Sequence, residues 1–277
     1  MTNIKGFVGA GGVAAMAALG MSSAALADDA ADGERKFGYS ITLTGTSDYL
    51  FRGISYTNND PAFQPFIEFT YGTPKLTWYL DLWGSNVHDG VGDPWELDVY
   101  AGVRPVTGRV SWDLGVLYYS NPSQHASTIN PTDAGTDYVE FKIAATITPI
   151  TNLSLTAIGY ATPDVGFASP VTETGEFDAA YTLPAMAIFT PIISGVVGYS
   201  HAERAGTFDA LCPKDNCDPS QVNRGTDSYV YWNAGLKLTV DKYFMDFRYW
   251  DTSISRQDDQ NGYADARFVF SAGVNLP

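Results

Sequence analysis

The stretch LTWYLDLW, residues 76–83, points to the fold class, because its apolar side chains recur at every second position. The stretch WELDVYAGVR, residues 95–104, repeats the pattern, and residues 138–147 and 230–240 do so again. A period of two places successive side chains on opposite faces of a β-strand. The sequence therefore predicts an all-β protein.

Strand length indicates which solvent surrounds the sheet. The alternating runs are ten to fourteen residues long. That exceeds the five or six residues typical of soluble sheets and matches the roughly 9 to 11 residues of a tilted membrane crossing. Alternation alone also fits a soluble sandwich, so the length favours a strand that crosses a membrane.

The connections between strands carry the most information. Twelve strands are predicted, at about 37–51, 63–71, 75–87, 94–106, 109–120, 136–148, 152–162, 176–189, 192–201, 227–240, 242–252 and 263–276. The links after the even strands are short, at 72–74, 107–108, 149–151, 190–191 and 241–242, and those after the odd strands are all longer. Bacterial outer-membrane barrels alternate short periplasmic turns with longer extracellular loops in this way. We therefore expect a transmembrane antiparallel up-and-down β-barrel of about twelve strands with both termini on the periplasmic side.

The N-terminal segment predicts export. Lys5 precedes an almost uncharged run over 6–26, and Ala25-Leu26-Ala27 stands directly before Asp28. Small residues at the end of such a run, with no basic flank beyond it, indicate a cleaved secretory signal peptide rather than a membrane helix. We predict a signal peptide over 1–27 and one barrel domain over 28–277, located in the outer membrane of a Gram-negative bacterium.

The net charge of the chain limits the classes of molecule that it could bind. The formal net charge is −15, which argues against nucleic acid as a partner. Outer-membrane lipid and small solutes or ions are the expected partners, and a homo-oligomer is left open.

Cys212 and Cys217 lie in the longest predicted loop and are expected to form a local disulfide, since the bacterial envelope is oxidising. Two thiolates supply only half a tetrahedral metal shell, and no cofactor or metal site is expected. The acidic stretches 89–93 and 258–262 could offer oxygen ligands to calcium, but neither fits the EF-hand pattern and solvated turns explain them more simply.

The face opposite the apolar one carries the candidate functional residues. If the apolar face meets lipid, these charged side chains line the lumen. Nine acids and six bases make up the set: Asp48, Arg52, Glu68, Asp81, Glu96, Asp98, Arg104, Asp113, Glu140, Lys142, Lys237, Asp246, Arg248, Asp265 and Arg267.

These charged residues allow two interpretations, which predict opposite functions. A hydrated lumen makes a passive diffusion channel, and the excess of acids predicts a weak cation preference. Alternatively the charges form a cross-strand network that plugs the barrel and leaves a structural or adhesive protein. The pairs expected in that network are Glu140 with Lys142, Asp246 with Arg248, and Asp265 with Arg267. Twelve strands lie between filled eight-stranded barrels and open sixteen-stranded porins, so size does not decide.

An enzyme is the third possibility. The three histidines, His88, His125 and His201, are predicted at loops or strand ends, where external active sites occur on some barrels. The sequence has no local signature for nucleophilic catalysis, and no catalytic residue is predicted. A sugar-binding aromatic slide in the lumen is a further alternative, built from Tyr79, Trp83, Tyr100, Tyr119 and Trp250.

Four stretches of the chain also resemble a known family, the TorF-type porins, also called the Gcw-chp family. The resemblance extends over nearly all of residues 28–277 and implies an outer-membrane barrel of porin type, a fold more firmly than an activity. The stretches are TSDYLFRGIS at 46–55, which is the most specific, WGSNV at 83–87, ELDVYAG at 96–102 and DLGVLYY at 113–119.

Overall fold

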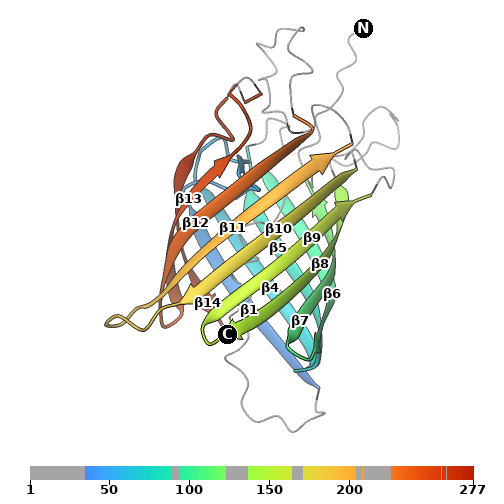
Figure 1. Ribbon diagram of the computed structural model, residues 1–277, viewed down its shortest axis with the longest axis vertical. Helices are drawn as coiled ribbons and strands as arrows, with labels where there is room; N and C mark the ends of the chain where they lie inside the picture. The colour runs from blue at the N-terminus through green and yellow to red at the C-terminus, as the bar shows by residue number, and fades with distance from the viewer. Residues whose placement is uncertain are drawn as a thin grey trace.

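The computed structural model describes residues 35–88, 94–122, 137–163, 171–203, 208, 226–256, 258–259 and 261–277. Twelve antiparallel strands form a closed barrel in which each strand pairs with its neighbour in sequence and the first closes on the last (Figure 1). The barrel strands are β1 Lys36–Thr46, β4 Ala62–Thr73, β5 Leu76–Asn86, β6 Trp95–Thr107, β7 Val110–Ser120, β8 Tyr138–Ile150, β9 Leu153–Thr162, β10 Thr172–Thr182, β11 Thr190–Ala202, β12 Ser228–Val240, β13 Tyr243–Thr252 and β14 Arg267–Leu276.

The predicted twelve-stranded barrel is thus confirmed, and its two ends differ. Short connections at 74–75, 108–109, 151–152, 183–189 and 241–242 join strands at one end, which we call the short-turn end. Longer segments join them at the other, the long-loop end. β1 begins and β14 finishes at the short-turn end, where Figure 1 places the C-terminus.

The two faces of the wall have opposite character. Large apolar side chains such as Trp78, Leu80 and Phe141 are exposed on the outside, whereas polar groups such as Asp81 and Glu140 are buried inside. A soluble protein that exposed so much apolar surface would associate or aggregate. Apolar side chains outward and polar side chains inward, along strands of this length, are the arrangement of a transmembrane β-barrel.

The chain has no barrel strand between β1 and β4. Residues 47–61 turn into the lumen, and we call this segment the inner hairpin. It contains the short strands β2, Leu50–Phe51, and β3, Ile54–Ser55, which pair with each other and with no barrel strand. The predicted strand 37–51 was therefore wrong at its far end, because the wall strand ends at Thr46.

Two other predicted boundaries were also wrong. β10 ends at Thr182, so the strand expected over 176–189 is shifted toward the N-terminus, and Thr190 and Pro191 begin β11 rather than forming a turn. Pro184 lacks the N–H that a ladder requires, which explains the break there. The connecting segment 183–189 carries a small bridge between Met186 and Phe189 and projects beyond the barrel at the short-turn end (Figure 1).

Several predictions concern parts of the chain outside the described residues. The signal peptide over 1–27, the Cys212–Cys217 disulfide, His125 and the acidic stretch 89–93 all fall there. No helix in the described part of the chain is long and apolar enough to cross a membrane.

Candidate functional site

The inner hairpin begins with local hydrogen bonds that redirect the chain. Ser47 N–H donates to the Phe270 carbonyl at 2.8 Å, and the Thr46 hydroxyl donates to the Asp48 carbonyl at 2.8 Å. These bonds tie the end of β1 to β14 while the chain turns inward. The tip residues Arg52 and Gly53 have φ angles of 48° and 85°. Positive φ favours glycine, and a Cβ at Gly53 would lie only 2.5 Å from Thr252 Cγ2, so the tip is pressed against β13.

Asp48 fixes the base of the hairpin. One carboxylate oxygen accepts hydrogen bonds from Ser55 Oγ at 2.6 Å and Thr57 Oγ1 at 2.9 Å. The other accepts from Arg267 Nη1 of β14 at 2.8 Å. A buried carboxylate with three donors has its charge well compensated. Asp48 therefore joins both arms of the hairpin to the barrel wall.

Arg52 and Glu140 connect the tip to β8. Arg52 Nη2 lies 3.0 Å from both oxygens of Glu140, and the two side chains are only 5% and 1% exposed. Tyr119 of β7 donates to Glu140 at 3.1 Å, and Tyr229 of β12 donates to the Arg52 carbonyl at 3.1 Å. Because β7 and β8 lie well separated from β12 around the barrel, the hairpin reaches across the lumen.

Aromatic side chains surround the hairpin in the long-loop half of the lumen. The Tyr49 ring lies 5.2 Å from that of Trp83, and the Tyr119 and Tyr138 rings stack at 4.4 Å. The Arg52 guanidinium lies 4.7 Å from the Tyr160 ring centroid, within cation–π range. The residues considered for an aromatic slide are packed into the lumen interior at 7% exposure or less: Tyr79, Trp83, Tyr100, Tyr119 and Trp250. They form part of a packed layer.

A charge network lies nearer the short-turn end. Arg104 of β6 contacts Glu68 at 2.5 Å and Asp113 at 3.7 Å. Lys142 Nζ lies 2.9 Å from Asp113, to which Tyr79 also donates at 2.8 Å. Arg104 remains 32% exposed at its side chain, so this half is less tightly filled than the half around the hairpin.

A second network lies on the β11–β13 side of the wall. Arg248 pairs with Asp246 at 3.0 Å and donates to Asn233 at 2.6 Å and to Ser194 at 2.8 Å. Lys237 Nζ lies 4.4 Å from the Phe244 ring centroid. The Asp246–Arg248 pair was among those considered from the sequence, whereas Lys142 pairs with Asp113 and not with Glu140.

The structure places fourteen of the fifteen predicted lining residues in the lumen. Asp48 and Arg52 reach it from the inner hairpin, and the other twelve from barrel strands: Glu68, Asp81, Glu96, Asp98, Arg104, Asp113, Glu140, Lys142, Lys237, Asp246, Arg248 and Arg267. Asp265 is the exception. It precedes β14 and pairs with exposed Arg256 at 3.2 Å, because β14 begins four residues later than predicted. Whether these residues line a path for a solute remains a prediction.

Two lumen carboxylates were missed. Glu176 and Asp178 are buried on the inner face of β10, on either side of outward Phe177. Both residues fall inside the predicted strand 176–189, and their alternation with Phe177 was visible in the sequence, but they were not included in the predicted lining. With these two included and Asp265 removed, ten acids face six bases in the lumen.

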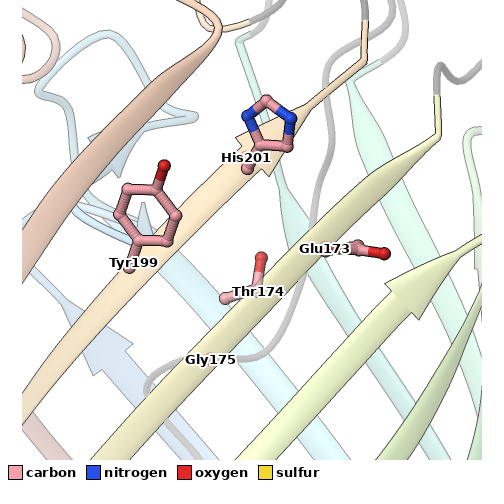
Figure 2. Close-up of a pocket in the computed structure, with 5 residues that line it drawn as sticks. All are labelled: Glu173, Thr174, Gly175, Tyr199 and His201. Atoms are coloured by element: carbon pink, nitrogen blue, oxygen red, sulfur yellow. The ribbon is translucent and has the colours of Figure 1, made fainter.

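A shallow pocket opens between β10 and β11 near the long-loop end. It is lined by Glu173, Thr174, Gly175, Tyr199 and His201, and Figure 2 shows the Glu173 carboxylate turned away from the His201 ring. His88 lies apart from it, beside the inner hairpin, where its backbone N–H donates to the Tyr56 carbonyl at 2.7 Å. Within the described residues no acid–histidine–hydroxyl hydrogen-bond chain is assembled around either histidine.

The fold and the polar lumen define the class as a transmembrane β-barrel of the bacterial outer-membrane type. Residues 28–212 match the family model described as "Bacterial protein of unknown function (Gcw_chp)", and the chain belongs to this family. The match covers the inner hairpin, whose sequence is the most specific part of the resemblance noted above. No curated protein matches the sequence.

Solved structures that are similar to the chain include two porins and LpxR. The NanC porin is 9% identical with a TM-score of 0.47, over 86% of this chain and 99% of that one. LpxR from Salmonella typhimurium is 9% identical with a TM-score of 0.46, over 86% of this chain and 99% of that one. The KdgM porin in complex with disordered oligogalacturonate is 10% identical with a TM-score of 0.46, over 86% of this chain and 98% of that one. These identities assign no activity to the present chain.

Proposed function

We propose that the protein is an exported outer-membrane channel of the porin type, through which small solutes or ions diffuse passively. The signal peptide over 1–27 would deliver it to the envelope, and the short-turn end would face the periplasm, as is usual for bacterial barrels. The inner hairpin would then lie at the extracellular side, where its buried contacts with β7, β8 and β12 fill part of the lumen.

The observation that carries the proposal is the charge of the lumen. Among the described residues, the ten acids and six bases counted above point into the barrel. Burying so many charges in a dry core would cost several kcal/mol for each unpaired one. An aqueous path with an acidic lining removes that cost and favours cations. Weak cation preference is therefore part of the proposal.

The second candidate function is a closed structural barrel. It is favoured by the almost complete burial of Arg52 and Glu140 and by the aromatic packing around the hairpin. We favour the channel because the hairpin has no strand pairing with the wall. It is held by side chains and a few loop hydrogen bonds, so it can leave without opening the barrel.

The test is the reversal potential of refolded protein in a planar bilayer under a KCl gradient. Conductance steps are expected, with a reversal potential shifted from zero toward the K⁺ equilibrium potential. The native chain should open rarely. A reversal potential shifted toward the Cl⁻ equilibrium potential would contradict the cation preference. A correctly folded barrel that gives no steps, with or without the hairpin tip, would favour the structural role.

A further inference from the structure

Two carboxylates in the lumen form no ion pair with a described arginine or lysine. Glu176 and Asp178 lie on the inner face of β10 and are each 6% exposed. Asp178 has no hydrogen-bond partner at either oxygen. Glu176 accepts a hydrogen bond from the Tyr231 hydroxyl at one oxygen, and its other oxygen has no partner.

The cations of the lumen are engaged elsewhere. Lys142 pairs with Asp113, Arg248 with Asp246 and Arg52 with Glu140. Among the described residues no Arg or Lys lies within ion-pair distance of Glu176 or Asp178. Two buried carboxylates so close together are costly unless a positive charge joins them.

The wall around Asp178 combines small side chains with oxygen atoms. Thr156 of β9 and Val196 of β11 lie opposite Asp178 in the ladders, and Ser154 and Ser194 lie opposite the next inward residue, Ala180. These side chains are shorter than those of the aromatic layer near the hairpin. Carboxylate and hydroxyl oxygens are the hard ligands that alkali and alkaline-earth cations prefer.

We propose that Glu176 and Asp178 form a binding subsite for a small inorganic cation, such as K⁺ or Ca²⁺, within the lumen. The inference rests on the proposed channel function and names the place where its cation preference arises. A cation entering from the short-turn end exchanges water for the Asp178 oxygens and the free oxygen of Glu176. It then leaves again, because two carboxylates do not enclose it.

The first test measures the permeability ratio of K⁺ to Cl⁻ from reversal potentials of native protein and single variants. Asp178→Asn and Glu176→Gln keep the side-chain shape and remove the charge, so each is expected to lower the ratio several-fold. Glu173→Gln is the matched control, since Glu173 lies on the same strand but on the outer face. Conducting Asp178→Asn and Glu176→Gln channels with the native ratio would overturn the subsite and leave the channel intact.

A second measurement separates failure of the subsite from failure of the channel. The thermal unfolding midpoint of detergent-solubilised protein is recorded with millimolar CaCl₂ and with NaCl of equal ionic strength. Binding to the folded state raises the midpoint, and the calcium-specific rise is expected in native protein and Glu173→Gln but not in Asp178→Asn. If native protein shows no such rise, the folded lumen does not bind the cation at these carboxylates and the inference is wrong, whether or not the protein conducts.

Discussion

Replacing Arg52 with alanine is expected to release the inner hairpin and to raise the permeability of the barrel about 100-fold. Removing one partner of a buried ion pair costs about 3–5 kcal/mol. Here the cost falls on the closed state, because Glu140 would stay buried without its partner, whereas departure of the hairpin would let water reach it. A shift of about 2.8 kcal/mol changes an equilibrium about 100-fold, so the open population should rise at least that much.

The measurement is the swelling rate of proteoliposomes in an isotonic pentose solution, with equal amounts of folded protein. The double variant Arg52→Ala with Glu140→Ala is the control. It lacks the ion pair but also lacks the stranded carboxylate, so its swelling should be clearly slower than that of Arg52→Ala. Equal swelling rates for native protein and Arg52→Ala would show that this ion pair does not hold the lumen closed.

Placing an arginine on the outer face at mid-height is expected to destabilise the protein strongly. Leu80 lies in the middle of β5, points outward and is 43% exposed. If that face meets hydrocarbon, Leu80→Arg should cost about 2–4 kcal/mol of unfolding free energy, the usual penalty for a cation at the bilayer midplane. In water the same change would be nearly neutral, because an exposed leucine gives up little when replaced by a charged residue.

Leu76→Arg provides the matched control within the same strand. Leu76 has the same chemistry, the same outward orientation and 42% exposure, but it stands beside the short turn. The arginine penalty falls to about 0–1 kcal/mol near the interface. Urea unfolding in phospholipid vesicles, followed by tryptophan fluorescence, should therefore separate the two variants. Equal costs at Leu76 and Leu80 would argue against a membrane around β5.

The barrel could be predicted from sequence because its main signal is local. Alternation in stretches such as LTWYLDLW, residues 76–83, follows directly from opposite solvents on the two faces of a wall strand. The alternation of short and long connections then gives the up-and-down order without any knowledge of distant contacts. Errors arose where the chain leaves the wall, since Tyr49, Leu50 and Phe51 are residue types typical of strands although the backbone has turned inward.

The inner hairpin could not be predicted because long-range partners define it. Arg52 was assigned to the lumen by parity, but its partner Glu140 lies 88 residues away and on β8. No local pattern distinguishes a side chain that lines a channel from one that holds a plug. The positive φ angles at Arg52 and Gly53 fit the Arg-Gly dipeptide in the family-specific stretch 46–55, and that dipeptide was the available hint of a turn.

The carboxylates of β10 show a different limit. Glu176 and Asp178 have the same alternating pattern that identified other lumen residues and lie within the predicted strand 176–189, yet they were left out of the predicted set. Which carboxylates carry an arginine or lysine partner depends on how side chains of paired strands reach one another across the inner face, as Arg104 of β6 and Lys142 of β8 both reach Asp113 of β7. The alternation of residues along a strand predicts which side chains point into the lumen, but not which of them form ion pairs.

We propose that the inner hairpin closes a lumen that is otherwise an aqueous path. The most direct test replaces residues 50–56 with a Gly-Ser linker of equal length, which removes the hairpin tip and leaves every barrel strand unchanged. Single-channel recording of this variant should show large, long-lived, cation-preferring steps, while native protein opens rarely. If the variant keeps heat-modifiable migration on gels, which indicates a folded barrel, and still gives no steps, the side chains of the wall alone block the lumen and the channel account is contradicted.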